Sequence, residues 1–122
     1  MTRSLTISVQ NEAQFWAEEQ AVAKRIDAGG DYQGEVRSFA SIELLFEALT
    51  PKRWALISKL KQLGPSSLRG LARSLGRDVK RVHEDAAFLL DEGIIERGSD
   101  KKLFVPYADI RVEISMADTL AA

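Results

Sequence analysis

The sequence predicts an α+β fold, and three patterns carry that prediction. Three consecutive segments with helical spacing of apolar residues occupy residues 51–93. Two short strand-like segments follow, around the polar turn Gly98-Ser99-Asp100-Lys101. Apolar and polar residues alternate near both ends of the chain, at residues 5–9 and 110–114. Three helices followed by a hairpin favour a winged helix-turn-helix, which places one helix in the major groove of DNA and a basic loop beside it.

The composition is that of an ordinary globular protein. The chain has 122 residues, of which 45% are hydrophobic and 29% charged, and this indicates one domain with short arms. No apolar run approaches the roughly 18 residues that a membrane span needs. The first ten residues lack the apolar segment of a signal peptide, and there is no cysteine for a disulfide framework. We therefore expect a cytoplasmic protein.

The charges are distributed unevenly along the chain. Residues 1–50 hold four Lys/Arg and eight Asp/Glu, residues 51–105 hold twelve and seven, and residues 106–122 hold one and three. The segment charges are therefore −4, +5 and −2, which account for the net charge of −1. Phosphates respond to the field within about 10 Å at physiological salt. The basic middle segment thus favours double-stranded DNA as a partner, with chance clustering of solvated charges as the alternative.

The two ends of the chain predict a homodimer. We expect residues 1–40 to be a dimerisation arm, residues 41–115 the winged helix-turn-helix domain, and residues 116–122 a flexible tail. The strands at 5–9 and 110–114 would each expose an edge in a monomer, which pairing between subunits would remove. A helix between Asn11 and Gly29 adds an apolar stripe. The residues expected at the subunit interface are Leu5, Ile7, Val9, Phe15, Trp16, Val22, Ile26, Ile110, Val112 and Ile114.

Start and stop signals delimit the three helices of the basic segment. Thr50 before Pro51 predicts the start of the first helix, and Ser67 and Asp78 are the expected N-caps of the other two. Gly76 lies where a helix-turn-helix needs a left-handed or open turn. The apolar positions expected to face inward include Trp54, Leu63, Leu71, Val79, Val82, Ala86 and Leu89, with His83 at the boundary of that face.

The opposite face of the third helix carries the residues expected to read DNA bases. At 100° per residue, the N-terminal part of this face consists of Arg77, Lys80, Arg81 and Glu84. Arg or Lys bound to guanine is the commonest specific contact, and a glutamate can accept a hydrogen bond from a cytosine amino group. An ordinary solvated helix face is the alternative for each residue.

Phosphate contacts are expected from hydroxyls and cations around that helix, and these position a protein without reading sequence. Ser66, Ser67 and Arg69 lie at the start of the second helix, where exposed N–H groups favour anions. The other candidates are Lys52 and Arg53 at the start of the first helix and Arg97, Lys101 and Lys102 in the hairpin.

The sequence contains no recognisable catalytic set. It has one histidine, no cysteine, no glycine-rich phosphate loop and no metal-ligand spacing. Asp85, Asp91 and Glu92 are interpreted as a solvated helix face. We therefore expect no enzyme, no catalytic residue, no metal and no cofactor.

The segments LTPKRWALISKL, SLRGLARSLGRDVKRVHEDAAFLLDEGIIER and VPYADIRVEI resemble MarR-like winged helix-turn-helix transcriptional regulators of bacteria and archaea. The resemblance covers residues 39–114, and GRDVKRVHEDAAFLLDEGIIE is its most specific part. It implies a dimeric DNA-binding regulator, and because some members lie beside toxin genes it also implies a possible antitoxin role.

Two functions from different classes follow from these observations. The first is sequence-specific DNA binding, most simply repression of the chain's own or a neighbouring operon. The alternative is an antitoxin whose acidic N-terminal half neutralises a toxin protein, and an antitoxin that represses its own promoter would combine both. A regulator that responds to a small molecule is a third hypothesis. A toxin-like reading frame beside the gene would favour the antitoxin.

Overall fold

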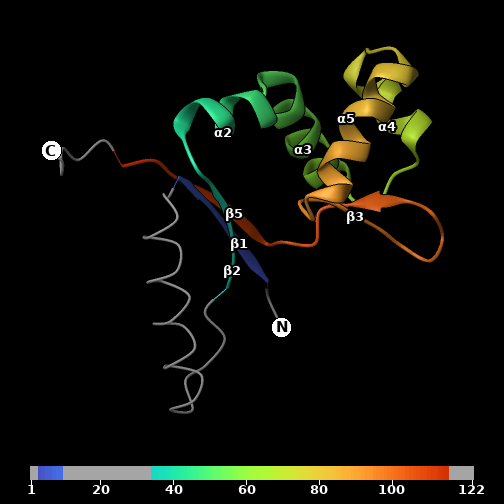
Figure 1. Cartoon of the computed structure of the whole chain (residues 1–122). Coiled ribbons are helices and arrows are strands. Elements are labelled where there is room, and N and C mark those ends of the chain that lie inside the picture. The colour runs from blue at the N-terminus through green and yellow to red at the C-terminus, as the bar shows by residue number, and fades with distance from the viewer. Residues whose placement is uncertain (1–2, 10–33, 116–122) are drawn as a thin grey trace, which may run out of the picture. The chain divides into compact units, whose positions relative to one another are not determined.

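The computed structural model describes residues 3–9 and 34–115, and these form a mixed α+β chain, as the sequence predicts. The chain divides into two compact units (Figure 1). One contains residues 1–48 and 107–122, and the other residues 49–106. Within the described residues, no helix is long and apolar enough to cross a membrane.

The first unit contains a three-stranded parallel sheet. Its strands are β1 (Ser4–Val9), β2 (Glu35–Phe39) and β5 (Asp109–Glu113), in the order β2-β1-β5. The strands expected at 5–9 and 110–114 are therefore confirmed, with small shifts of their ends. The expectation that β1 exposes an edge in a monomer is wrong, because β1 is the central strand and both of its edges are paired within the chain. Leu5 and Ile7 are buried in this unit.

A short helix, α2 (Ile42–Ala48), follows β2 in the same unit. Ser41 caps it, because its Oγ accepts a hydrogen bond from the backbone N–H of Leu44 at 3.1 Å. Leu45 is buried, whereas Leu44 and Phe46 are exposed. The division of the chain thus differs from the expected boundary at residue 40, since α2 and β5 both lie in the unit that contains the N-terminal strand.

The second unit is built on three helices whose predicted caps are confirmed. They are α3 (Pro51–Leu63), α4 (Leu68–Leu75) and α5 (Val79–Asp91). The side chains of Thr50, Ser67 and Asp78 accept hydrogen bonds from backbone N–H groups three residues further on. Gly76 ends α4 with φ 64° and ψ 34°, the left-handed conformation that glycine adopts at low cost.

A hairpin of two short strands completes the second unit. Strands β3 (Glu96–Arg97) and β4 (Leu103–Phe104) pair antiparallel, and they are shorter than the expected segments 94–97 and 102–105. Ser66, just before α4, adds an antiparallel bridge to Leu103 through two backbone hydrogen bonds of 2.9 and 2.8 Å. This bridge attaches the hairpin to the start of α4.

Apolar side chains from all three helices and the hairpin form the core of the second unit. The buried residues include Leu56, Ile57, Leu60, Leu71, Ala72, Val82, Ala86, Leu89, Ile94, Ile95 and Leu103. Two residues expected to face inward are exposed, Leu63 by 46% and Val79 by 37%, because each lies at the end of its helix. Trp54 is half-buried, and His83 is exposed instead of lying at the edge of the core.

Leu71 provides a direct test of this core. Its side chain is fully buried on α4, which packs against both α3 and α5. We expect Leu71→Ala to lower the free energy of unfolding by about 2–5 kcal/mol, the usual range for truncation of a buried leucine. Leu63→Ala removes the same atoms from an exposed position and is the control. Equal effects of the two substitutions in denaturant melts would contradict the packing of α4.

Candidate nucleic-acid interface

The exposed face of α5 carries three of the four charged residues that the sequence predicts there. Lys80, Arg81 and Glu84 are exposed, while Val82, Ala86 and Leu89 bury the other face. The left-handed turn at Gly76 and the cap at Asp78 set where this helix begins. The first two turns of α5 therefore present two cations and one carboxylate to solvent.

The residues near the starts of α3 and α4 that are expected to contact phosphate differ in whether their side chains are free to do so. Lys52 and Arg69 are exposed. The Ser66 hydroxyl donates to the carbonyl oxygen of Gly64 at 2.8 Å, and Ser67 Oγ accepts from the N–H of Gly70 at 3.0 Å. Ser67 keeps its hydroxyl hydrogen as a donor for an anion, whereas the hydroxyl hydrogen of Ser66 is already used.

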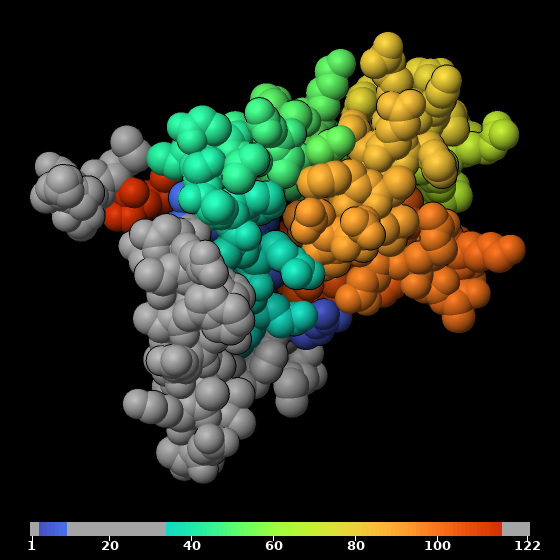
Figure 2. All heavy atoms as spheres, in the orientation of Figure 1, coloured from blue at the N-terminus to red at the C-terminus, as the bar shows by residue number. Residues whose placement is uncertain are grey.

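The hairpin carries three exposed cations, Arg97 at the end of β3 and Lys101 and Lys102 in the connection between the strands. Gly98 N–H donates to Lys102 O, and Lys101 N–H donates to Gly98 O, each at 2.9 Å. Asp100 Oδ1 accepts from the N–H of Lys102 at 3.0 Å. These bonds hold the loop in one conformation with Lys101 at φ 68°. In Figure 2 the hairpin segment (orange) lies at the surface beside the segment of α4 and α5 (yellow to amber).

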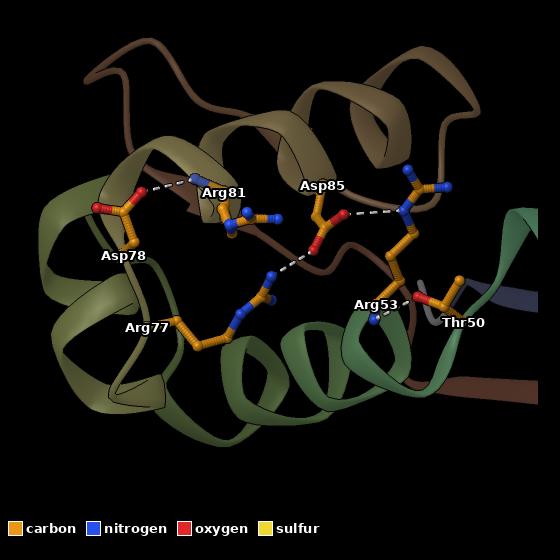
Figure 3. A network of polar contacts seen from close by, with 6 residues as sticks. All are labelled: Thr50, Arg53, Arg77, Asp78, Arg81 and Asp85. Carbon is orange, nitrogen blue, oxygen red and sulfur yellow. Dashed lines mark hydrogen bonds and ion pairs between the residues drawn. The ribbon is translucent and has the colours of Figure 1, made fainter.

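A carboxylate on α5 joins two arginines from different parts of the second unit (Figure 3). Asp85 Oδ1 accepts from Arg53 Nε of α3 at 3.0 Å, and Oδ2 accepts from Arg77 NH2 at 2.9 Å. The three side chains are between 16% and 21% exposed. The Arg53 guanidinium also lies 4.1 Å from the centroid of the Phe88 ring, a cation–π contact. We call Arg53, Asp85 and Arg77 the Asp85 cluster.

The Asp85 cluster corrects three interpretations of the sequence. Asp85 is not part of a solvated face, because it binds both arginines. Arg77 does not lie on the outer face with Lys80, since its side chain reaches back to Asp85, and its NH1 atom is buried without a hydrogen-bond partner. Arg53 is likewise engaged within the unit. Both arginines hold elements of the second unit together.

The two arginines also set the protonation of Asp85. Burial alone would raise the pKa of its carboxyl group, but the hydrogen bonds and positive charges of Arg77 and Arg53 outweigh burial and lower the pKa below its ordinary value. Asp85 is therefore ionised at neutral pH. The inward position of Asp85 could have been predicted from the sequence. Asp85 follows Val82 by three residues and precedes Leu89 by four, and this spacing places it on the inner side of the helix.

The residues expected at a subunit interface are only partly described. Phe15, Trp16, Val22 and Ile26 lie outside the described residues. Val9 and Ile110 are half-buried, and Val112 and Ile114 are 40% and 37% exposed. Among residues 3–9 and 34–115, no group of three acidic or histidine side chains is placed to hold a metal ion.

Comparison with known proteins gives a family but no activity. Residues 48–112 match the HVO_A0114 family, and they include all the helices and strands of the second unit. Because the match covers more than half of the 122 residues, the chain belongs to the HVO_A0114 family. No curated protein and no solved structure matches the chain.

Proposed function

We propose that residues 49–106 form a winged helix-turn-helix domain and that the chain is a sequence-specific DNA-binding regulator of transcription. In this proposal α4 and α5 are the helix-turn-helix, α5 is the recognition helix, and the β3–β4 hairpin is the wing. The observation that carries the proposal is the exposed N-terminal face of α5, with Lys80, Arg81 and Glu84 where a recognition helix meets base edges.

The charge of the second unit supports the same assignment. Residues 49–106 hold twelve Lys/Arg and seven Asp/Glu, a net charge of +5, although the whole chain has −1. Arg97, Lys101 and Lys102 on the hairpin, with Lys52 and Arg69, are suited to phosphate contacts. The resemblance to MarR-like regulators agrees with this function. We propose repression as its outcome and a homodimer as its working form, since two copies can read a palindromic site.

The proposal is tested by selecting duplexes that the purified full-length chain retains from a pool of random 30-base-pair DNA. We expect enrichment of a short sequence, and competition by that sequence but not by its scrambled form. Equally strong binding to the selected sequence and to its scrambled form would show that the protein binds DNA without sequence preference. No binding at low salt would overturn the function altogether.

The proposed wing makes a separate prediction. Lys101→Ala with Lys102→Ala should weaken binding to the selected and scrambled duplexes alike, because phosphate contacts carry no sequence information. The slope of log affinity against log salt should fall by about two, one for each lost contact. Arg37→Ala with Lys59→Ala removes two cations that are not among the proposed DNA contacts and is the control. An unchanged salt slope in the hairpin variant would show that the proposed wing does not contact DNA.

A further inference from the structure

Strand β5 lies at one end of the sheet of the first unit, among the strands that the structure describes. It pairs with β1 on one side, and within the part of the chain that the structure describes no strand lies against its other side. Val112 in this strand is 40% exposed, and Ile114, the residue directly after it, is 37% exposed. An edge strand with exposed apolar residues is a template for another strand. The residues of β5 indicate which strand fits.

The two faces of β5 differ in chemistry. Ile110 and Val112 lie in register with Leu5 and Ile7 of β1, so these four residues form an apolar patch on one face of the sheet. Arg111 and Glu113 lie in register with Thr6 and Ser8 on the opposite face, and their side chains are 66% and 59% exposed. A partner strand must therefore bring apolar residues to one face and complementary charges to the other.

We propose that a second copy of this chain supplies that strand, with the two β5 strands antiparallel about a two-fold axis beside Val112. In this register Val112 faces the partner's Val112, and Ile110 faces the partner's Ile114. On the other face Arg111 lies opposite the partner's Glu113, and symmetry repeats this pair. The pairing joins two three-stranded sheets into one and covers the exposed apolar residues of β5.

Charge and side-chain direction disfavour the other registers. A two-fold axis at Arg111 would place Arg111 against itself and Asp109 against the partner's Glu113, which sets like charges directly opposite. A shift by one residue would bring apolar side chains against charged ones. An axis at Ile110 also matches charges, but it places Glu113 opposite the partner's Tyr107, which is buried. The axis at Val112 instead pairs Ile110 with Ile114, which follows β5 and is exposed.

Single cysteines report the register, because the chain contains no cysteine of its own. Directly opposed residues in an antiparallel pair have Cα atoms about 4.5–5.5 Å apart, which a disulfide spans. We expect Val112→Cys to form a covalent dimer under mild oxidation. Arg111→Cys and Ile110→Cys alone should not, since each lies too far from its own copy. Efficient cross-linking of Ile110→Cys but not Val112→Cys would overturn the proposed register.

Charge reversal tests the same register in solution without cross-links. Arg111→Glu or Glu113→Arg alone opposes like charges at both symmetric positions, and we expect the dimer dissociation constant to rise by about tenfold or more. The double variant restores both pairs with the charges exchanged, so it should dimerise like the parent. Sedimentation across a concentration series measures this. A monomeric parent, or a double variant as weak as the single ones, would overturn the proposal.

This inference deepens the homodimer of the proposed function, but its measurements contain no DNA. A monomer that still selects a DNA sequence would contradict the β5 pairing and leave the DNA-binding proposal in place. A dimer paired through β5 that retains no DNA would contradict the DNA-binding proposal and leave the β5 pairing in place.

Discussion

Replacing Lys80 and Arg81 together by alanine is expected to weaken binding to the selected duplex by about 2–6 kcal/mol, since each good contact to a base edge contributes about 1–3 kcal/mol. Both residues are exposed in the first turn of α5. Because base contacts carry the sequence information, binding to a scrambled duplex should change less than binding to the selected one. Gel-shift titrations at several salt concentrations measure both effects.

The control for this variant is again Arg37→Ala with Lys59→Ala, which removes the same charge at residues that are not among the proposed DNA contacts. Glu84→Gln provides a separate test on the same helix face. If Glu84 accepts a hydrogen bond from cytosine, this substitution should change the preferred base at one position of the site. Parental affinity of the Lys80 and Arg81 double variant at all salt concentrations would show that α5 is not the recognition helix.

The sequence predicted the local features of the second unit well, because their causes are local. Thr50, Ser67 and Asp78 cap the helices that follow them, and Gly76 adopts the left-handed conformation. Each depends on a few neighbouring residues and on the backbone freedom of glycine. The exposed positions of Lys80, Arg81 and Glu84 follow from helical periodicity alone.

Pairings between distant segments could not be predicted in the same way. The alternation at residues 5–9 predicts a strand, but it does not show that β2 and β5 will pair with both of its edges. The role of Arg77 depends on Asp85, eight residues away, and on Arg53 of α3, which reaches the same carboxylate from another helix. In the sequence alone both arginines have the pattern of exposed cations, and for this reason it predicts DNA contacts for them.

Asp85→Ala is expected to lower the free energy of unfolding by about 1.5–3 kcal/mol, because it removes charge-assisted hydrogen bonds from partly buried guanidinium groups. Here two guanidinium groups lose the same carboxylate, and Arg77 NH1 already lacks a partner. The substitution also releases α3 and the turn before α5 from each other. Glu84→Ala, on the exposed face of the same helix, is the matched control and should change stability by less than about 0.5 kcal/mol.

The stabilising effect of Asp85 should depend on pH in a defined direction. The arginines lower its pKa in the folded state, so the unfolded chain, with an aspartate pKa of about 3.9, binds the proton first as pH falls. The contribution is therefore complete above about pH 5 and is lost as pH falls through the folded-state pKa. Asp85→Asn cannot titrate, so its stability deficit relative to the parent should stay constant above about pH 5 and shrink as pH falls from about 5 towards 3. Denaturant melts across this range measure the difference, and a deficit that stays constant would show that the Asp85 cluster does not hold the carboxylate ionised.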